Sequence, residues 1–225
     1  MSHQFRAIIT KELREIWWIG LLGSLAVLWI VGYLMGWYVD GPPSFLYRQE
    51  PQALPFLKDD FIGALMIFGG VTAAVLGLRQ TLGESAQGTW MFFLFRPADR
   101  HRLILTKIAV GIAWLMFCTG LPLFVLALWA ATPGTHISPF EWWMTGPAVR
   151  AWGWFPVVYC AAFLCGLRPA RWWVSRFLPG IISMVPAMMM LAGPWWSWQV
   201  WLANLVLLAL LLCATYFAVR QRDYA

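Results

Sequence analysis

The chain consists of six long apolar stretches, and its Lys and Arg residues are sorted into alternate gaps between them. A helix needs roughly 17 residues or more to cross the hydrocarbon core of a bilayer, and each stretch reaches that length. The sequence therefore predicts an all-α integral membrane protein with six transmembrane helices. The predicted spans are residues 16–39, 61–78, 103–131, 149–167, 177–193 and 198–219.

Positive charge indicates how these spans are oriented, because cytoplasmic loops are enriched in Lys and Arg. The N-terminal arm, the second loop with Lys107, the fourth loop and the tail together hold 13 of the 16 Lys and Arg residues. Asp and Glu residues divide evenly between the two sides of the membrane. The net charge of +6 therefore separates into about +8 on the side of these four segments and about −2 on the opposite side. We therefore expect both termini in the cytoplasm of a cell, with the chain in a bacterial inner (plasma) membrane.

The composition leaves no room for a separate soluble domain. Hydrophobic residues make up 61% of the 225 residues and charged residues only 12%, whereas soluble domains carry about a quarter charged residues. Residues 1–225 are therefore expected to form a single transmembrane domain. The basic pI near 9.5 is explained by the charged loops and by contact with anionic membrane lipids, so we expect no nucleic-acid partner.

The predicted spans lack the residues that chemistry or ion coupling in a membrane requires. Pumps and ion-coupled carriers place charged or titratable side chains inside the bilayer, but the polar residues expected there are Thr72, Thr119, Ser183 and Asn204, which can bond backbone carbonyls. No nucleophile with its base and no phosphate-binding loop is present, so we expect no enzyme activity, metal or cofactor in this chain. The four cysteines lie in predicted spans as packing residues: Cys118, Cys160, Cys165 and Cys213.

The segment before the first span is expected to be an amphipathic helix on the inner membrane surface. Its apolar residues recur three and four positions apart, as on one face of a helix. Its charged residues, Glu12 among them, fill the other positions. The apolar positions are Phe5, Ile8, Ile9, Leu13, Ile16 and Trp17, and the charged positions are Arg6, Lys11, Glu12, Arg14 and Glu15. A solvated extension of the first span is the alternative.

Small residues and prolines mark two further features of the spans. Gly32 with Gly36, and Gly70 with Ala74, place small residues four apart, which permits close approach of two helices. The partner of such a face is either another helix of this chain or a second subunit. The fifth span contains Pro179 and Pro186, and because proline removes a backbone hydrogen bond we expect a kink in that helix.

The second cytoplasmic loop, residues 79–102, is the richest segment outside the spans. A polar stretch through Gln87 is compatible with a helix, Gly88 marks a turn, and Asp99 can cap the next helix. A short helix across the inner surface, with Glu84 facing the cytoplasm, would suit docking of a cytosolic partner. An ordinary amphipathic connector is the alternative.

Three patches of the chain carry a resemblance to a known family. They are residues 11–14, the loop with Glu84, Gly88 and Thr89 and with residues 96–100 leading to Lys107, and the tail 217–224. In these patches the chain resembles the ABC type-2 permease family, the membrane subunits of ABC exporters. The resemblance implies that two six-span subunits, the same or different, form a pathway, and that a separate cytosolic subunit binds and hydrolyses ATP with Mg²⁺. It also implies that residues 79–95 act as a coupling helix, with Glu84 as the principal contact.

The sequence thus favours a permease subunit of an ATP-driven transporter. A multi-span anchor or scaffold that recruits a cytosolic partner through residues 79–102 is the alternative, and a membrane enzyme with an unrecognised site is the third possibility. The residues expected to contact the ATPase subunit are Gly83, Glu84, Ser85, Gln87, Gly88 and Arg96.

Overall fold

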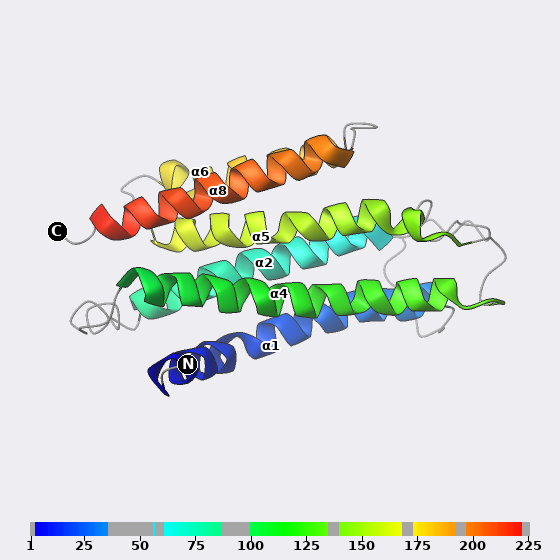
Figure 1. Ribbon diagram of the computed structural model, residues 1–225, viewed down its shortest axis with the longest axis horizontal. Coiled ribbons are helices and arrows are strands. Elements are labelled where there is room, and N and C mark those ends of the chain that lie inside the picture. The colour runs from blue at the N-terminus through cyan, green and yellow to red at the C-terminus, as the bar shows by residue number, and fades with distance from the viewer. Residues whose placement is uncertain are drawn as a thin grey trace.

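The computed structural model describes residues 3–35, 56, 61–86, 100–134, 140–167, 173–191 and 197–221. Within these ranges all regular secondary structure is helical, and the long helices lie side by side in an elongated bundle (Figure 1). The elements are α1 (His3–Leu34), α2 (Phe61–Ala86), α4 (Arg100–Ala131), the 3₁₀ helix η1 (Trp142–Thr145), α5 (Gly146–Leu167), α6 (Trp173–Ile182), α7 (Val185–Leu191) and α8 (Ser197–Gln221).

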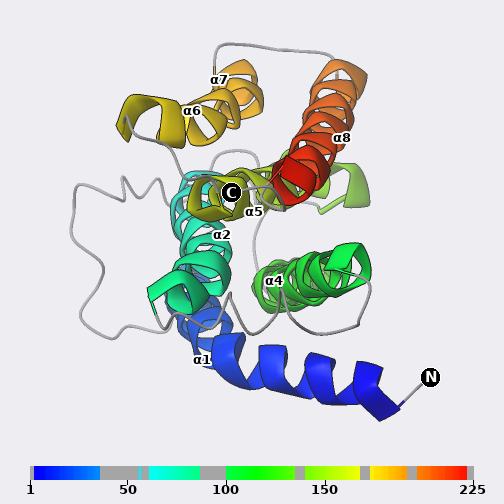
Figure 2. The same ribbon diagram turned by 90° about the vertical axis from the view of Figure 1, so that its left-hand side faces the viewer.

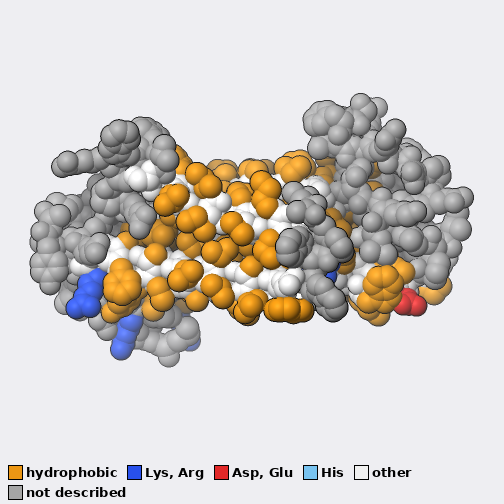
Figure 3. Space-filling view, turned by 90° about the horizontal axis from the view of Figure 1, so that it is seen from above, with side chains coloured by type: hydrophobic (Ala, Val, Ile, Leu, Met, Phe, Trp, Pro, Cys, Tyr) orange, Lys and Arg blue, Asp and Glu red, His pale blue; other side chains and the backbone are white. Residues whose placement is uncertain are grey.

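The bundle is compatible with an integral membrane protein. Large apolar side chains such as Leu22, Phe117 and Leu205 face outward, and apolar side chains form a band along the middle of the molecule (Figure 3). Such an extensive apolar surface is expected in contact with lipid rather than with water. Five segments are long and apolar enough to cross a bilayer, namely Arg6–Leu34, Phe61–Gly83, Arg102–Ala131, Trp142–Leu167 and Trp198–Arg220.

The remaining predicted span, residues 177–193, is divided into two short helices. α6 ends at Ile182 and α7 begins at Val185. Pro186 has no amide hydrogen to bond the carbonyl one turn earlier, at Ile182, so the break falls where the proline requires it. The discontinuity that the prolines predict is thus confirmed. It is held in place by α5, because the indole Nε1 of Trp154 donates a hydrogen bond to the Ser183 carbonyl at 2.6 Å.

α5 occupies the centre of the bundle, between α2 and α4 on one side and α6, α7 and α8 on the other (Figure 2). Every residue from Val157 to Leu167 is buried, so this half of the helix is surrounded by protein. α2 packs closely along α5 through glycines. A Cβ on Gly77 would lie 2.5 Å from the Tyr159 carbonyl oxygen and 2.9 Å from the Phe163 nitrogen, so the two backbones meet at a distance that only glycine permits.

The N-terminal arm and the first span belong to one helix. α1 is continuous over 32 residues, although its N-terminal part runs across the end of the bundle at an angle to the rest of the helix (Figure 2). Likewise, α2 continues through Ala86, so residues 79–86 are its last turns. Polar residues can extend a helix beyond the bilayer, because each added residue completes one more backbone hydrogen bond.

The backbone contact at Gly77 yields a stability test. We expect Gly77→Ala to destabilise the fold by about 1–3 kcal/mol, because the added methyl meets the backbone of α5, which cannot move aside as a side chain can. Gly63→Ala is the matched control, since nothing lies within 4 Å of a Cβ there. Thermal unfolding of the purified protein in detergent measures both. Equal melting temperatures for the two variants would contradict the close packing of α2 on α5.

Candidate functional site

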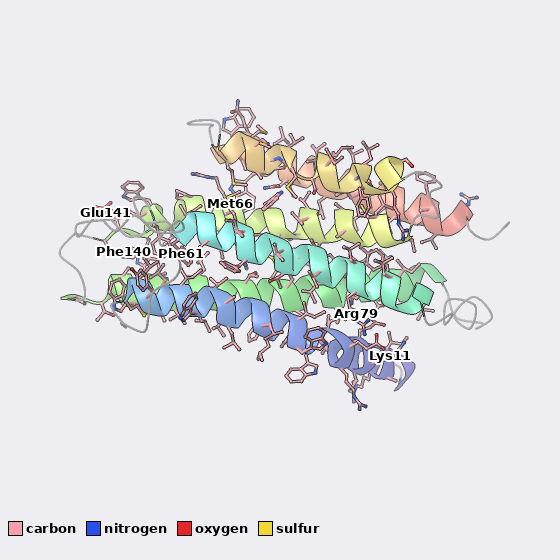
Figure 4. The ribbon with its side chains drawn as sticks, turned by 180° about the vertical axis from the view of Figure 1, so that it is seen from behind. Lys11, Phe61, Met66, Arg79, Phe140 and Glu141 are labelled. Carbon is pink, nitrogen blue, oxygen red and sulfur yellow. The ribbon has the colours of Figure 1, made fainter. Side chains whose placement is uncertain are left out.

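A cluster of polar side chains is buried where four helices meet. It consists of Glu12 from α1, Gln80 from α2, Lys107 from α4 and Tyr159 from α5, each at most 4% exposed. We call these four residues the polar network. Lys11 and Arg79, the sequence neighbours of Glu12 and Gln80, lie at one end of the bundle, opposite Phe140 and Glu141 (Figure 4). The polar network therefore belongs to the end that carries the N-terminus.

The polar network is joined by consecutive interactions. Lys107 Nζ lies 3.2 Å from Glu12 Oε1, and Gln80 Nε2 donates to Glu12 Oε2 at 3.3 Å. The Tyr159 hydroxyl donates to Gln80 Oε1. Both oxygens of the carboxylate and both ends of the amide are thus engaged, and four helices are linked through one set of contacts.

Helical periodicity places these side chains on the buried faces of their helices. Glu12 precedes the buried Ile16 by one turn, and Lys107 adjoins the buried Ile104 and Ile108. Gly111, one turn after Lys107, opens the space for the tyrosine, since a Cβ there would lie 2.5 Å from Tyr159 Cζ and 2.8 Å from Gln80 Oε1. The small residue in α4 is therefore part of the geometry of the polar network.

The electrostatics of the polar network differ from those of an ion pair at the surface. Lys107 and Glu12 expose 6% and 1% of their side chains, whereas the Lys11–Glu15 pair, 3.7 Å apart, exposes 47% and 43%. A buried charge is costly unless it is paired and hydrogen-bonded. Lys107 and Glu12 satisfy that condition together, so the loss of either one leaves the other charge buried without compensation.

The sequence-based view of the interior was wrong in this respect. Glu12 was expected on the polar face of the N-terminal arm and Lys107 with the second cytoplasmic loop, and the interior of the spans was expected to lack charged groups. The structure buries both residues. The sequence signal for this burial was their helical spacing from Ile16 and from Ile104. A charged residue on the same face as a buried apolar stripe needs an oppositely charged or hydrogen-bonding partner in the protein interior.

The polar residues that were expected inside the spans behave in two ways. Thr72 Oγ1 donates to the Phe68 carbonyl at 2.7 Å, Thr119 Oγ1 to the Leu115 carbonyl at 2.7 Å, and Ser183 Oγ to the Gly180 carbonyl at 2.6 Å. These three confirm the expectation of bonding to backbone carbonyls. Asn204 does not, because neither its Oδ1 nor its Nδ2 has a hydrogen-bond partner.

The residues predicted to contact an ATPase subunit lie at the end of α2 or beyond it. Gly83 is half-buried beside the Arg79 guanidinium, whose Nη1 would be 3.3 Å from an added Cβ. Glu84 and Ser85 belong to the last turn of α2. The other three, Gln87, Gly88 and Arg96, are outside the described residues. The contact role of all six residues stays a prediction.

The small residues predicted at helix interfaces are distributed over two helices. Gly70 of α2 lies against α5, since a Cβ there would be 3.2 Å from the Trp154 ring. Ala74, one turn later, is partly buried against the core. Gly32 is half-buried in α1, and Gly36 is outside the described residues. The glycine in α2 therefore meets a helix of this same chain.

Comparison with known proteins gives no independent indication of function. No family model, no curated protein and no solved structure matches the chain.

The buried ion pair predicts an asymmetry between single and double substitutions. We expect Lys107→Met or Glu12→Gln alone to destabilise the protein by about 3–5 kcal/mol, because each disrupts the pairing of a buried charge. Combining the two substitutions removes both charges and should restore much of the loss. Thermal unfolding in detergent measures this cycle, with Lys11→Met as the control, for which an exposed pair predicts at most about 1 kcal/mol. Additive losses in the double variant would contradict the pairing of Glu12 with Lys107.

Proposed function

We propose that the chain is the membrane-spanning permease subunit of an ATP-driven ABC transporter, an exporter, powered by a separate cytosolic ATP-binding subunit. The observation that carries the proposal is the position of the polar network. Gln80 lies near the end of α2 and Lys107 near the beginning of α4, so both helices that flank the segment 87–99 are linked to Glu12 of α1. A force applied to this segment would reach three helices together.

Six membrane crossings are supported by the path of α6 and α7. Residues 173–191 would span about 28 Å as a continuous helix, close to the roughly 30 Å of a hydrocarbon core. The pair begins near the end of α5 and finishes near the start of α8, at the opposite end of the bundle (Figure 1). With this sixth crossing, the start of α1, the end of α2, the start of α4 and the end of α8 fall on one side, which the charge distribution of the sequence assigns to the cytoplasm.

The proposed mechanism needs two partners. The ATP-binding subunit holds ATP and Mg²⁺ and docks on residues 83–96, while a second permease subunit, the same chain or another, completes the pathway. Approach of the two ATP-binding subunits on binding ATP would move the docked segment. ATP can shift the transporter between two conformations only if it binds one of them more tightly than the other. The docked segment must therefore stay attached both to the ATP-binding subunit and to the membrane helices. The polar network supplies the attachment on the membrane side.

The docking role of the segment after Arg79 yields a functional test. We expect Glu84→Lys, or alanine at Gly83, Glu84, Ser85 and Gln87 together, to lower the ATPase rate of the complex by about fivefold or more. Membrane insertion should remain, because the change lies beyond the apolar part of α2. The measurement is ATP hydrolysis by the complex purified from native membranes, where an ATPase with a phosphate-binding loop should copurify with the wild-type chain.

Glu15→Lys is the matched control for this experiment. It reverses a carboxylate at the same end of the bundle on an exposed face of α1, and should leave the ATPase rate unchanged. Unaltered hydrolysis in Glu84→Lys would argue against docking through this segment. Copurification of a partner that is no ATPase would instead favour a scaffold that recruits it.

A further inference from the structure

Asn204 of α8 is buried with its whole side-chain amide unpaired. It is 3% exposed, and neither Oδ1 nor Nδ2 is hydrogen-bonded. By contrast, the buried threonines and Ser183 bond carbonyls of their own helices, and Glu12, Gln80 and Lys107 bond one another. An unsatisfied buried amide is costly, so its retention in the middle of an apolar helix requires an explanation.

Asn204 lies three residues after a close contact between α8 and the proline-containing helix α5. Trp201 of α8 packs on Gly153 of α5, whose added Cβ would be 2.5 Å from the Trp201 ring. Pro156 follows Gly153 by three residues on α5, and Asn204 follows Trp201 by three residues on α8. Because α5 and α8 run in the same direction (Figure 1), both residues lie on the same side of this contact along the bundle. Pro156 is inside α5 and donates no hydrogen bond to the carbonyl of Trp152.

The broken helix α6–α7 completes this junction. α7 contacts both α5 and α8, and Trp154, two residues before Pro156, bonds the Ser183 carbonyl at the break. Discontinuous helices inside a membrane are tolerated where their backbone is buried in protein or lines a cavity, and in transporters they often mark binding sites. The proline of α5, the broken α6–α7 and the unsatisfied amide of α8 thus belong to three helices that pack on one another.

The chemistry of this junction defines what could bind there. A primary amide offers donors and an acceptor, and a hydroxyl group offers both in return. The junction has no Lys, Arg, Asp or Glu on α5 after Arg150, on α7 or on α8 before Arg220, so it favours a neutral group over an ionic headgroup. The outward face of α8 carries Leu202, Leu205 and Val206, which suits an apolar tail in contact with lipid.

We propose that the junction of α5, α7 and α8 binds a neutral amphiphile that carries a hydroxyl group, with the Asn204 amide as its hydrogen-bonding anchor. The amide is enclosed by protein in the structure, so a bound molecule would reach it only after a helix has moved. α8 is the least buried of the five long apolar helices and packs chiefly on α5 and α7. Outward movement of α8 would therefore admit such a molecule from the bilayer. Binding at the junction is independent of the proposed ATPase partner and is measurable on the isolated chain.

The test uses photolabelling of the full chain in lipid nanodiscs. The probes are a diazirine-bearing dodecanol and the matched diazirine-bearing dodecane, and labelled peptides are identified by mass spectrometry. In the wild type we expect the alcohol to label peptides of α5, α7 and α8 roughly fivefold more than the alkane does, as one hydrogen bond in a membrane allows. Asn204→Leu should reduce this labelling to the level of the alkane.

Two controls separate the anchor from a structural role. Thr215→Val changes another buried polar residue of α8, whose hydroxyl already bonds the Leu211 carbonyl at 2.7 Å, and should keep full labelling by the alcohol. Asn204→Leu should melt at the same temperature or higher, because an apolar group replaces an unsatisfied amide. Equal labelling of the wild type by alcohol and alkane, undiminished labelling of Asn204→Leu, or a lower melting temperature of that variant would each overturn the proposal.

Discussion

The ion pair between Glu12 and Lys107 is the contact that determines how the helices of this bundle can meet. Two opposite charges almost entirely removed from solvent can persist only if their separation is kept short and their remaining hydrogen-bonding capacity is used. Gln80 and Tyr159 meet the second requirement. The positions of α1, α2, α4 and α5 at this end are therefore interdependent, since displacement of one helix would expose a charge to an apolar interior.

Small residues make the polar network possible. The side chain of Tyr159 reaches Gln80 only because α4 has glycine at position 111, and α2 lies near enough to α5 only because it has glycine at position 77. In a membrane, where apolar helices gain little from leaving lipid, such close backbone contact and buried hydrogen bonds are the main sources of association. Glycine contacts and polar network thus reinforce each other within the same helices.

The sequence predicts the extent of the helices better than their internal contacts. The start of the second helix at Phe61 and the ends of α4 at Ala131 and α5 at Leu167 coincide with the predicted bounds, because length and hydropathy alone decide where a chain can enter a bilayer. The break in the fifth span follows from its prolines.

The pairing of Glu12 with Lys107 does not follow from the sequence. Charge sorting assigns both residues to the cytoplasmic side and says nothing about which way their side chains point. Only the register of each residue with its buried neighbours carries that information, and a partner 95 positions away in the chain is not specified by local pattern.

α5 connects the two halves of the molecule, and this gives the bundle a mechanical path. Its Tyr159 belongs to the polar network, and its Trp154 holds the break between α6 and α7. The two residues are five positions apart, or about 7.5 Å along a helix, so one short segment of α5, which contains Pro156, links the polar network to the break. α8 packs chiefly on α5 and α7 and would follow both. A change that starts at the end of α2 and the beginning of α4 can therefore reach Asn204 through the segment of α5 that contains Pro156, where one missing backbone hydrogen bond makes the helix easiest to bend.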